Sequence, residues 1–190
     1  FTISDEVTEE VEIVEHVMCL KNGKVAGPSR IRAEHLKVWC KNGSQSWLDF
    51  VRVVQECFTT GEIPKAMCFS TLVLIPKADG SLQGIGLLEV AWKVVSGIVQ
   101  QRLQAGIEFE DSLHGFQPKR SVGTAMLVHK LITEQSLHGG WMLFQVFLDL
   151  KKAYDALDRG QTLLILEQYG VGLKVRHLLH NFWQGLEVVP

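Results

Sequence analysis

The stretch MCFSTLVLIPKADGSLQGIGLL, residues 67–88, decides the fold class of this chain. β-Branched and apolar residues fill positions 69–75, which favours a strand. Asp79 and Gly80 follow it as a tight-turn signal, and a second apolar arm comes after the turn. Two glycines weaken that second arm, because glycine is unfavourable inside a strand. The stretch therefore predicts a β-hairpin in the middle of the chain.

Helical patterns lie on both sides of this hairpin. Ser4 is expected to cap a first helix, in which Val7, Val11, Val14 and Met18 recur at helical spacing. Glycines, capping residues and apolar periodicity predict further helices at residues 33–39, 46–58, 88–104, 124–137, 159–169 and 174–183.

A second apolar run, residues 142–149, ends at Asp149. It is apolar on both faces, so we expect a central strand of a sheet. The order of helices, hairpin, helices, strand and helices predicts an α+β protein rather than a regular βαβ alternation. An aspartate at the carboxyl end of a buried strand lies at the sheet edge, where magnesium and phosphate ligands commonly bind. The alternative is a strand that stops, followed by a turn and a helix with a solvated face.

Composition restricts the class of protein. A chain of 190 residues with 46% hydrophobic and 21% charged residues suits one globular domain. Its apolar runs are shorter than the roughly 18 residues of a membrane span, and we see no signal peptide, so an intracellular location, nuclear or cytoplasmic, is expected. Four cysteines without a CxxC pair argue against a zinc site and disulfides. A net charge of −2 neither supports nor excludes nucleic acid, and the oligomeric state stays unknown.

Five ordered blocks of the sequence resemble one enzyme family. KVAGPSRI (24–31) resembles K-x-x-G-P-D-G-I, and GEIPKAMCFSTLVLIPKADGS (61–81) resembles G-x-[IV]-P-x-x-W followed by V-x-[IL]-P-K. IGLLEVAWKVVSGIVQQRLQ (85–104) is similar to a block that begins I-S-L-L and ends R-L. HGFQPKRSVGTA (114–125) resembles G-F-x-x-x-R-[SG]-[TV], and FLDLKKAYDALD (147–158) resembles D-L-x-K-A-[FY]-D. Together they resemble the reverse transcriptase of non-LTR, LINE-like retrotransposons.

The resemblance implies a fold and a division into domains. It implies the fingers of a right-hand polymerase and the first part of the palm, truncated before the second catalytic carboxylate block. Residues 1–60 would form a helical N-terminal extension and the entry to the fingers. Residues 61–140 would form the fingers, with the hairpin 69–88 and the helices that follow it. Residues 141–190 would start the palm.

The same resemblance implies an RNA-directed DNA polymerase that transfers deoxynucleotides by a two-magnesium mechanism, on an RNA template and a DNA primer. Asp149 would bind both Mg²⁺ ions, and the carbonyl of Leu150 would add an oxygen ligand. Tyr154 would pack beneath the incoming sugar and exclude a 2′-hydroxyl, or it is an ordinary core aromatic. Asp155 and Asp158 are expected to cap or pair locally.

Four further positions would contact nucleotides or template. Lys77 resembles the fingers lysine that holds the incoming triphosphate, with a solvated turn lysine as the alternative. Gln83 stands where the family has an arginine that completes this contact, so weaker nucleotide binding is expected. Lys119 and Arg120 match a basic loop along the template backbone.

The family's Q-G-x-P and [FY]-A-D-D blocks, which supply the remaining metal carboxylates, are not found in these 190 residues. We therefore expect the isolated chain to be inactive as a polymerase. One alternative is a non-catalytic nucleic-acid-binding or interaction module left from a decayed retroelement. Another is a stand-alone magnesium phosphotransferase using Asp149, for which no second carboxylate stands at a recognisable spacing.

Overall fold

The computed structural model describes residues 3–78, 80–154 and 156–189. The chain divides into two compact units, each described by itself below: unit 1 comprises Phe1–Ile107 and Asp158–Pro190, and unit 2 comprises Glu108–Leu157. Asp79 and Asp155 lie outside the described residues, and so do the predictions that concern them. The division predicted from the sequence, at residues 60 and 140, stays a prediction.

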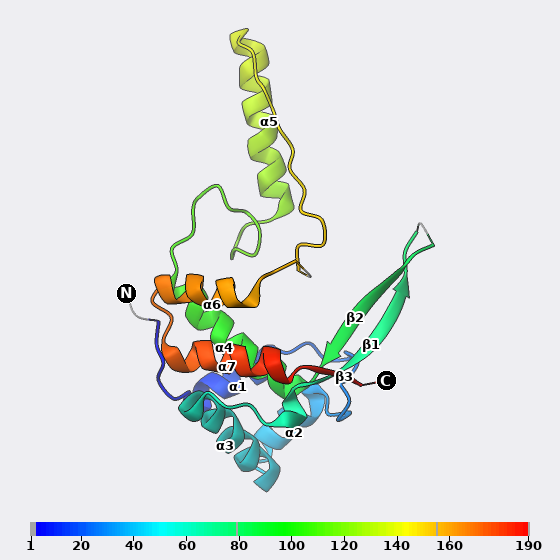
Figure 1. Cartoon of the computed structure of the whole chain (residues 1–190), viewed down its shortest axis with the longest axis vertical. Coiled ribbons are helices and arrows are strands. Elements are labelled where there is room, and N and C mark those ends of the chain that lie inside the picture. The colour runs from blue at the N-terminus through cyan, green and yellow to red at the C-terminus, as the bar shows by residue number, and fades with distance from the viewer. Residues whose placement is uncertain (1–2, 79, 155, 190) are drawn as a thin grey trace. The chain divides into compact units, whose positions relative to one another are not determined.

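Within the described residues the chain forms seven α-helices, one 3-10 helix and three strands (Figure 1). The helices are α1 (Glu10–Cys19), α2 (Ala33–Lys41), α3 (Gln45–Thr60), η1 (Lys65–Met67), α4 (Val90–Gly106), α5 (Val122–Gly139), α6 (Arg159–Gln168) and α7 (Leu173–Gly185). The strands are β1 (Phe69–Pro76), β2 (Leu82–Leu88) and β3 (Glu187–Val189). The predicted α+β class is confirmed. None of the described helices is both long and apolar enough to cross a bilayer.

The predicted hairpin is confirmed. β1 and β2 pair antiparallel, in a register that runs from Ser70 opposite Leu88 to Pro76 opposite Leu82. β3, which the sequence did not predict, pairs parallel to the start of β1, so the sheet order is β2-β1-β3. The three strands belong to unit 1, where the hairpin extends outward from the helices (Figure 1).

α4 supplies the centre of the core of unit 1. Val94, Val95 and Ile98 of α4 are completely buried. α1 packs against α4, and α3 packs against α7. The apolar stripe predicted for residues 88–104 is confirmed, because its central members are buried. This helix follows β2 directly, so the core fixes the base of the hairpin.

The first helix differs from its prediction in two ways. α1 begins at Glu10, and Ser4, the predicted cap, instead accepts a hydrogen bond from the N–H of Glu6 (3.1 Å) in a local turn. Ile13 and Val17 are the residues that α1 buries. The predicted stripe is wrong at three exposed positions, Val7, Val11 and Met18. The segment has apolar residues on two helical faces, and periodicity alone does not tell which face meets the core.

In unit 2 the segment 141–150 has no regular secondary structure, so the predicted strand at 142–149 is wrong. A strand needs a hydrogen-bonded neighbour, and none of the described strands pairs with this segment. It returns alongside α5 instead (Figure 1). The hydroxyl of Ser136 donates to the carbonyl of Trp141 (2.7 Å). The Nε2 atom of the His129 ring lies 3.0 Å from the Oε1 atom of the Gln145 amide. The apolar side chains around Leu148, itself 91% exposed, remain uncovered.

Candidate functional site

The hairpin brings Lys77 and Gln83 onto one face. Gln83 lies opposite Ile75 in the register, and the N–H of Lys77 donates to the carbonyl of Ser81 across the turn (2.8 Å). Because successive side chains in a strand alternate between faces, Lys77 and Gln83 are diagonal neighbours on the same face. Both are exposed. A cation and an amide therefore stand side by side near the end of the hairpin.

The other face of the hairpin is apolar and also exposed. Leu72 and Leu74 are about half exposed, and they lie over the strand opposite, where Gly84 leaves room for them. A two-stranded ribbon is only marginally stable by itself in water. The pairing with β3 and the packing of α4 therefore hold the hairpin at its base, while its outer part stays open to solvent.

Three of the predicted catalytic positions lie in unit 2, in or just after the segment that returns along α5. Asp149 is exposed, in backbone without strand pairing. Leu150 and Tyr154 are 77% and 82% exposed. Since Tyr154 is so exposed, it is not a core aromatic in this structure. The local role expected for Asp158 is confirmed, because its carboxylate accepts the N–H of Gln161 (2.9 Å) and caps α6.

The donor atoms available around Asp149 fit part of a magnesium site. Asp149 offers one carboxylate, and the backbone of Leu150 offers a carbonyl oxygen. Mg²⁺ is commonly held by one or two carboxylates, with substrate phosphates and water completing its octahedron. Among the described residues, no group of three or more His, Cys, Asp or Glu side chains lies close enough together to hold a metal ion by itself.

The two basic residues in the loop before α5, Lys119 and Arg120, differ in their contacts. Arg120 forms an ion pair with Asp111 (2.7 Å) and donates to the carbonyl of Leu113 (3.1 Å), so its guanidinium ties the loop together. Lys119 is exposed and has a left-handed backbone, with φ of 61°. Lys119 is therefore the more available of the two for an external phosphate.

A cationic pocket in unit 1 was not predicted from the sequence. It has a volume of about 170 Å³, an apolar floor that includes Ile31 and Val90, and no acidic side chain among its described lining residues. Four basic residues line it: Lys21, Lys24, Arg32 and Lys93. The loop 21–31 had a visible basic character, but Lys93 joins it only because α4 packs beside that loop. No sequence pattern links positions so far apart.

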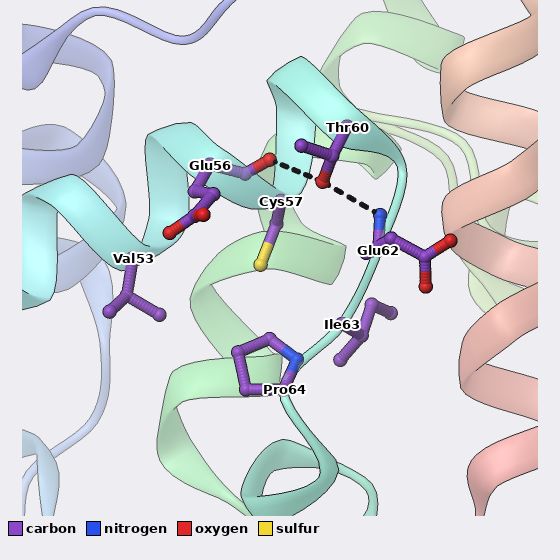
Figure 2. Close-up of a pocket in the computed structure, with 7 residues that line it drawn as sticks. All are labelled: Val53, Glu56, Cys57, Thr60, Glu62, Ile63 and Pro64. Carbon is purple, nitrogen blue, oxygen red and sulfur yellow. Dashed lines mark hydrogen bonds between the residues drawn. The ribbon is translucent and has the colours of Figure 1, made fainter.

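A second pocket, of about 340 Å³, lies at the carboxyl end of α3 (Figure 2). Its lining includes Cys57, which is buried. Burial, with a smaller effect of the Glu56 carboxylate, raises the pKa of the Cys57 thiol to about 11. The thiol is therefore protonated at neutral pH and is a poor nucleophile. This pocket is suited to binding rather than to covalent catalysis.

No protein-family model matches the chain. Over 134 residues the chain is 28% identical to the transposon TX1 uncharacterized 149 kDa protein of Xenopus laevis. The match covers 65% of this chain and 10% of that protein, so the chain spans about a tenth of the length of the curated relative. The similarity supports a transposon origin for this sequence.

Proposed function

We propose that the chain is part of the reverse transcriptase of a LINE-like retrotransposon, an RNA-directed DNA polymerase. The observation that carries the proposal is the set of five ordered blocks between residues 24 and 158, in a chain similar to a transposon protein. The α+β architecture and the hairpin between Phe69 and Leu88 agree with fingers that precede a palm. The partners would be an RNA template, a DNA primer and deoxynucleoside triphosphates.

The reaction requires two magnesium ions, which activate the primer 3′-hydroxyl and neutralise the leaving pyrophosphate when bound. Asp149 and the carbonyl of Leu150 would hold them, together with carboxylates from other parts of a polymerase. Tyr154 would lie beneath the sugar of the incoming nucleotide and exclude a 2′-hydroxyl. Its exposed ring is free of the core, as this role requires.

Two surfaces would bind phosphates. Lys77 and Gln83, on one face of the hairpin, would contact the triphosphate, with Gln83 giving the weaker, uncharged contact. Lys119 would contact the template backbone, whereas Arg120 would position the loop through its ion pair with Asp111.

The cationic pocket favours a second candidate function, a nucleic-acid-binding module without catalysis. Four basic side chains around one pocket provide a non-specific attraction for phosphates that needs no magnesium. This function would be that of a decayed retroelement product, in which the fold persists and the polymerase chemistry does not.

Binding measurements on the purified 190-residue chain distinguish the two functions. Magnesium-dependent binding of a deoxynucleoside triphosphate, lost in Asp149→Asn and weakened in Lys77→Gln, supports the polymerase. Binding of an RNA–DNA hybrid with a steep salt dependence, without nucleotide binding, supports the module. The absence of both contradicts both. We expect no primer extension by this chain alone, because Asp149 supplies one metal carboxylate; measurable extension contradicts that expectation.

A further inference from the structure

Strand β2 forms one edge of the small sheet of unit 1, in the hairpin that extends outward from the helices of that unit (Figure 1). Among the described strands its one neighbour is β1, and the two pair without interruption from Leu82 to Leu88. A strand has hydrogen-bonding groups on both sides, so the outer side of β2 offers backbone groups that no described strand uses.

The register of the hairpin tells which residues carry these outward groups. The N–H of Lys77 donates to the carbonyl of Ser81, so these two opposite residues turn their backbone groups toward each other. In an antiparallel ladder every second pair does the same, and the pairs between them turn their N–H and C=O groups away. Counting along the register from that bond, Leu82, Gly84 and Gly86 direct their backbone groups outward, away from β1.

This edge lacks the features that usually protect an edge strand, which are charged side chains, prolines and bulges. Residues 82–88 include no charged residue and no proline, and their pairing with β1 is continuous. The other side of the sheet differs, because β3 covers the start of β1 and Pro76, which has no N–H to donate, ends that strand. The edge at β2 is therefore the one open to a further strand.

Apolar side chains lie beside the edge on both faces of the hairpin. On one face Leu72 and Leu74 lean over Gly84, where an added Cβ atom would lie 3.0 Å from a methyl carbon of Leu72 and 3.9 Å from one of Leu74. Both leucines are about half exposed. On the other face Ile85 is 40% exposed. A strand added beside β2 would therefore bury apolar surface as well as satisfy backbone groups.

We propose that β2 pairs antiparallel with β2 of a second copy of this chain, so that two hairpins form one sheet across a twofold axis. The outward groups become crowded beyond Gly86, because a side chain at Gly27 would lie 3.0 Å from the carbonyl carbon of Leu88. The pairing that uses all three outward residues places Gly84 on the axis and Leu82 opposite Gly86 of the second copy. Two identical strands are compatible here because neither carries a charge that its copy would repel.

The dimer would be weak, because its interface is small. One pair of short strands buries less than the roughly 1,600 Å² of a standard interface, so we expect a dissociation constant of about 10–1,000 μM. The pairing depends on the backbone of β2 and on apolar side chains, and it needs neither magnesium nor a nucleotide. It therefore stands or fails separately from the polymerase.

Sedimentation velocity and amide hydrogen exchange on the whole chain, each measured from dilute to concentrated samples, provide the test. We expect a reversible change from monomer to dimer, with slower exchange at the amides of Leu82, Gly84 and Gly86 in the dimer. Ile85→Lys places like charges near the twofold axis and should weaken dimerisation about tenfold or more. Val73→Lys adds the same charge to the same face, directly opposite Ile85 on the inner strand, and should leave dimerisation unchanged.

A mixture of two variants separates repulsion at the axis from damage to the hairpin. Ile85→Lys and Ile85→Glu should each be monomeric alone, because like charges then lie near the axis. Mixed in equal amounts, they should dimerise again, because opposite charges then lie near the axis. A hairpin that the substitutions merely destabilise would not be rescued by mixing.

Several outcomes overturn the proposal. A parent chain that stays monomeric well above the expected dissociation constant contradicts it, and so do dimers that Ile85→Lys leaves intact or that Val73→Lys weakens equally. Slow exchange of the three outward amides in the dilute monomer means that another part of the chain covers the edge. Open-ended aggregates in place of dimers exclude a closed twofold pairing. Circular dichroism checks that the variants are folded, and if they are not, the exchange rates of the parent chain decide.

Discussion

Trp92 stacks flat on Phe182, with ring centroids 3.7 Å apart and planes that differ by 6°. Both side chains are 5% exposed. The contact joins α4, which follows the hairpin, to α7, which precedes β3. Since β3 pairs with β1, the two edge strands of the sheet, β2 and β3, are each continuous with one of these helices. The aromatic pair therefore holds together the two helices that position the sheet.

Removing the contact between Trp92 and Phe182 should lower the stability of unit 1. Phe182→Ala deletes a buried ring and leaves a cavity, so we expect a loss of about 3–5 kcal/mol in the free energy of unfolding. Urea denaturation, followed by tryptophan fluorescence, measures it. The matched substitution Phe144→Ala removes a ring that is 85% exposed and should change stability by less than about 0.5 kcal/mol. Similar losses in the two variants contradict this role for the stack.

An ion pair between Glu12 and Arg102 should make stability depend on pH. Arg102 donates to both oxygens of Glu12, at 3.1 and 2.8 Å, and Thr8 donates as well, at 2.5 Å. Burial raises the pKa of Glu12, but the hydrogen bonds from Arg102 and Thr8 and the charge of Arg102 outweigh it, so the pKa is below its ordinary value. The pair therefore stabilises the fold above the unfolded pKa of about 4.3, and the stabilisation is lost as pH falls through the folded pKa.

The variant Glu12→Gln tests this dependence. At pH 7 it should lower the free energy of unfolding by about 2 kcal/mol, a value typical of hydrogen bonds to charged groups. At pH 3 the difference from the parent chain should shrink, because Glu12 then approaches its neutral form. Glu15→Gln, which removes an exposed carboxylate from the same helix, should have little effect at either pH. A constant difference across the pH range contradicts the role of ionised Glu12.

Asp5 should be required for the first turn of α7. Its carboxylate accepts the N–H groups of Lys174 and Val175, both at 3.1 Å, while the N-cap residue Gly172 offers no side chain. Asp5→Ala should cost about 1 kcal/mol, as other lost helix caps do. Hydrogen exchange at these two amides should become faster, whereas Glu6→Ala, at the next exposed acid, should leave both rates unchanged. Unchanged exchange in Asp5→Ala contradicts the cap.

Local sequence signals predict the elements whose causes are local. The hairpin appears because β-branched residues flank a turn. The helix predicted at 46–58 extends two residues further, to Thr60, where Gly61 adopts the left-handed conformation and ends it. β3 could not be predicted in the same way. Three residues, Glu187 to Val189, show no useful periodicity, and their strand exists only through pairing with β1. The segment 142–149 is the reverse case, since its composition favours a strand but no described strand pairs with it.

In the candidate site, too, features with local causes could be predicted from the sequence, and features that depend on tertiary contacts could not. Lys77 and Gln83 share a face because a short turn sets the register of the hairpin. Since the sequence predicts that turn, it also predicts that these two residues lie close together. Lys93 joins Lys21 at the cationic pocket because α4 packs beside a loop about seventy positions earlier in the chain, which only tertiary structure determines. The pocket at the carboxyl end of α3 likewise depends on a contact between residues distant in sequence, because the amide of Asn181 donates to the carbonyl of Gly61.

Arginine at position 83 should strengthen nucleotide binding if the hairpin contacts a triphosphate. A guanidinium beside Lys77 can form bidentate, charge-assisted contacts that the amide of Gln83 cannot form. We expect Gln83→Arg to lower the Kd for a fluorescent deoxynucleoside triphosphate about tenfold, in line with hydrogen bonds to charged groups. Leu82→Arg adds the same charge to the opposite face of the hairpin and should give a much smaller gain. Equal gains would mean that general attraction, rather than the shared face of Lys77 and residue 83, governs binding.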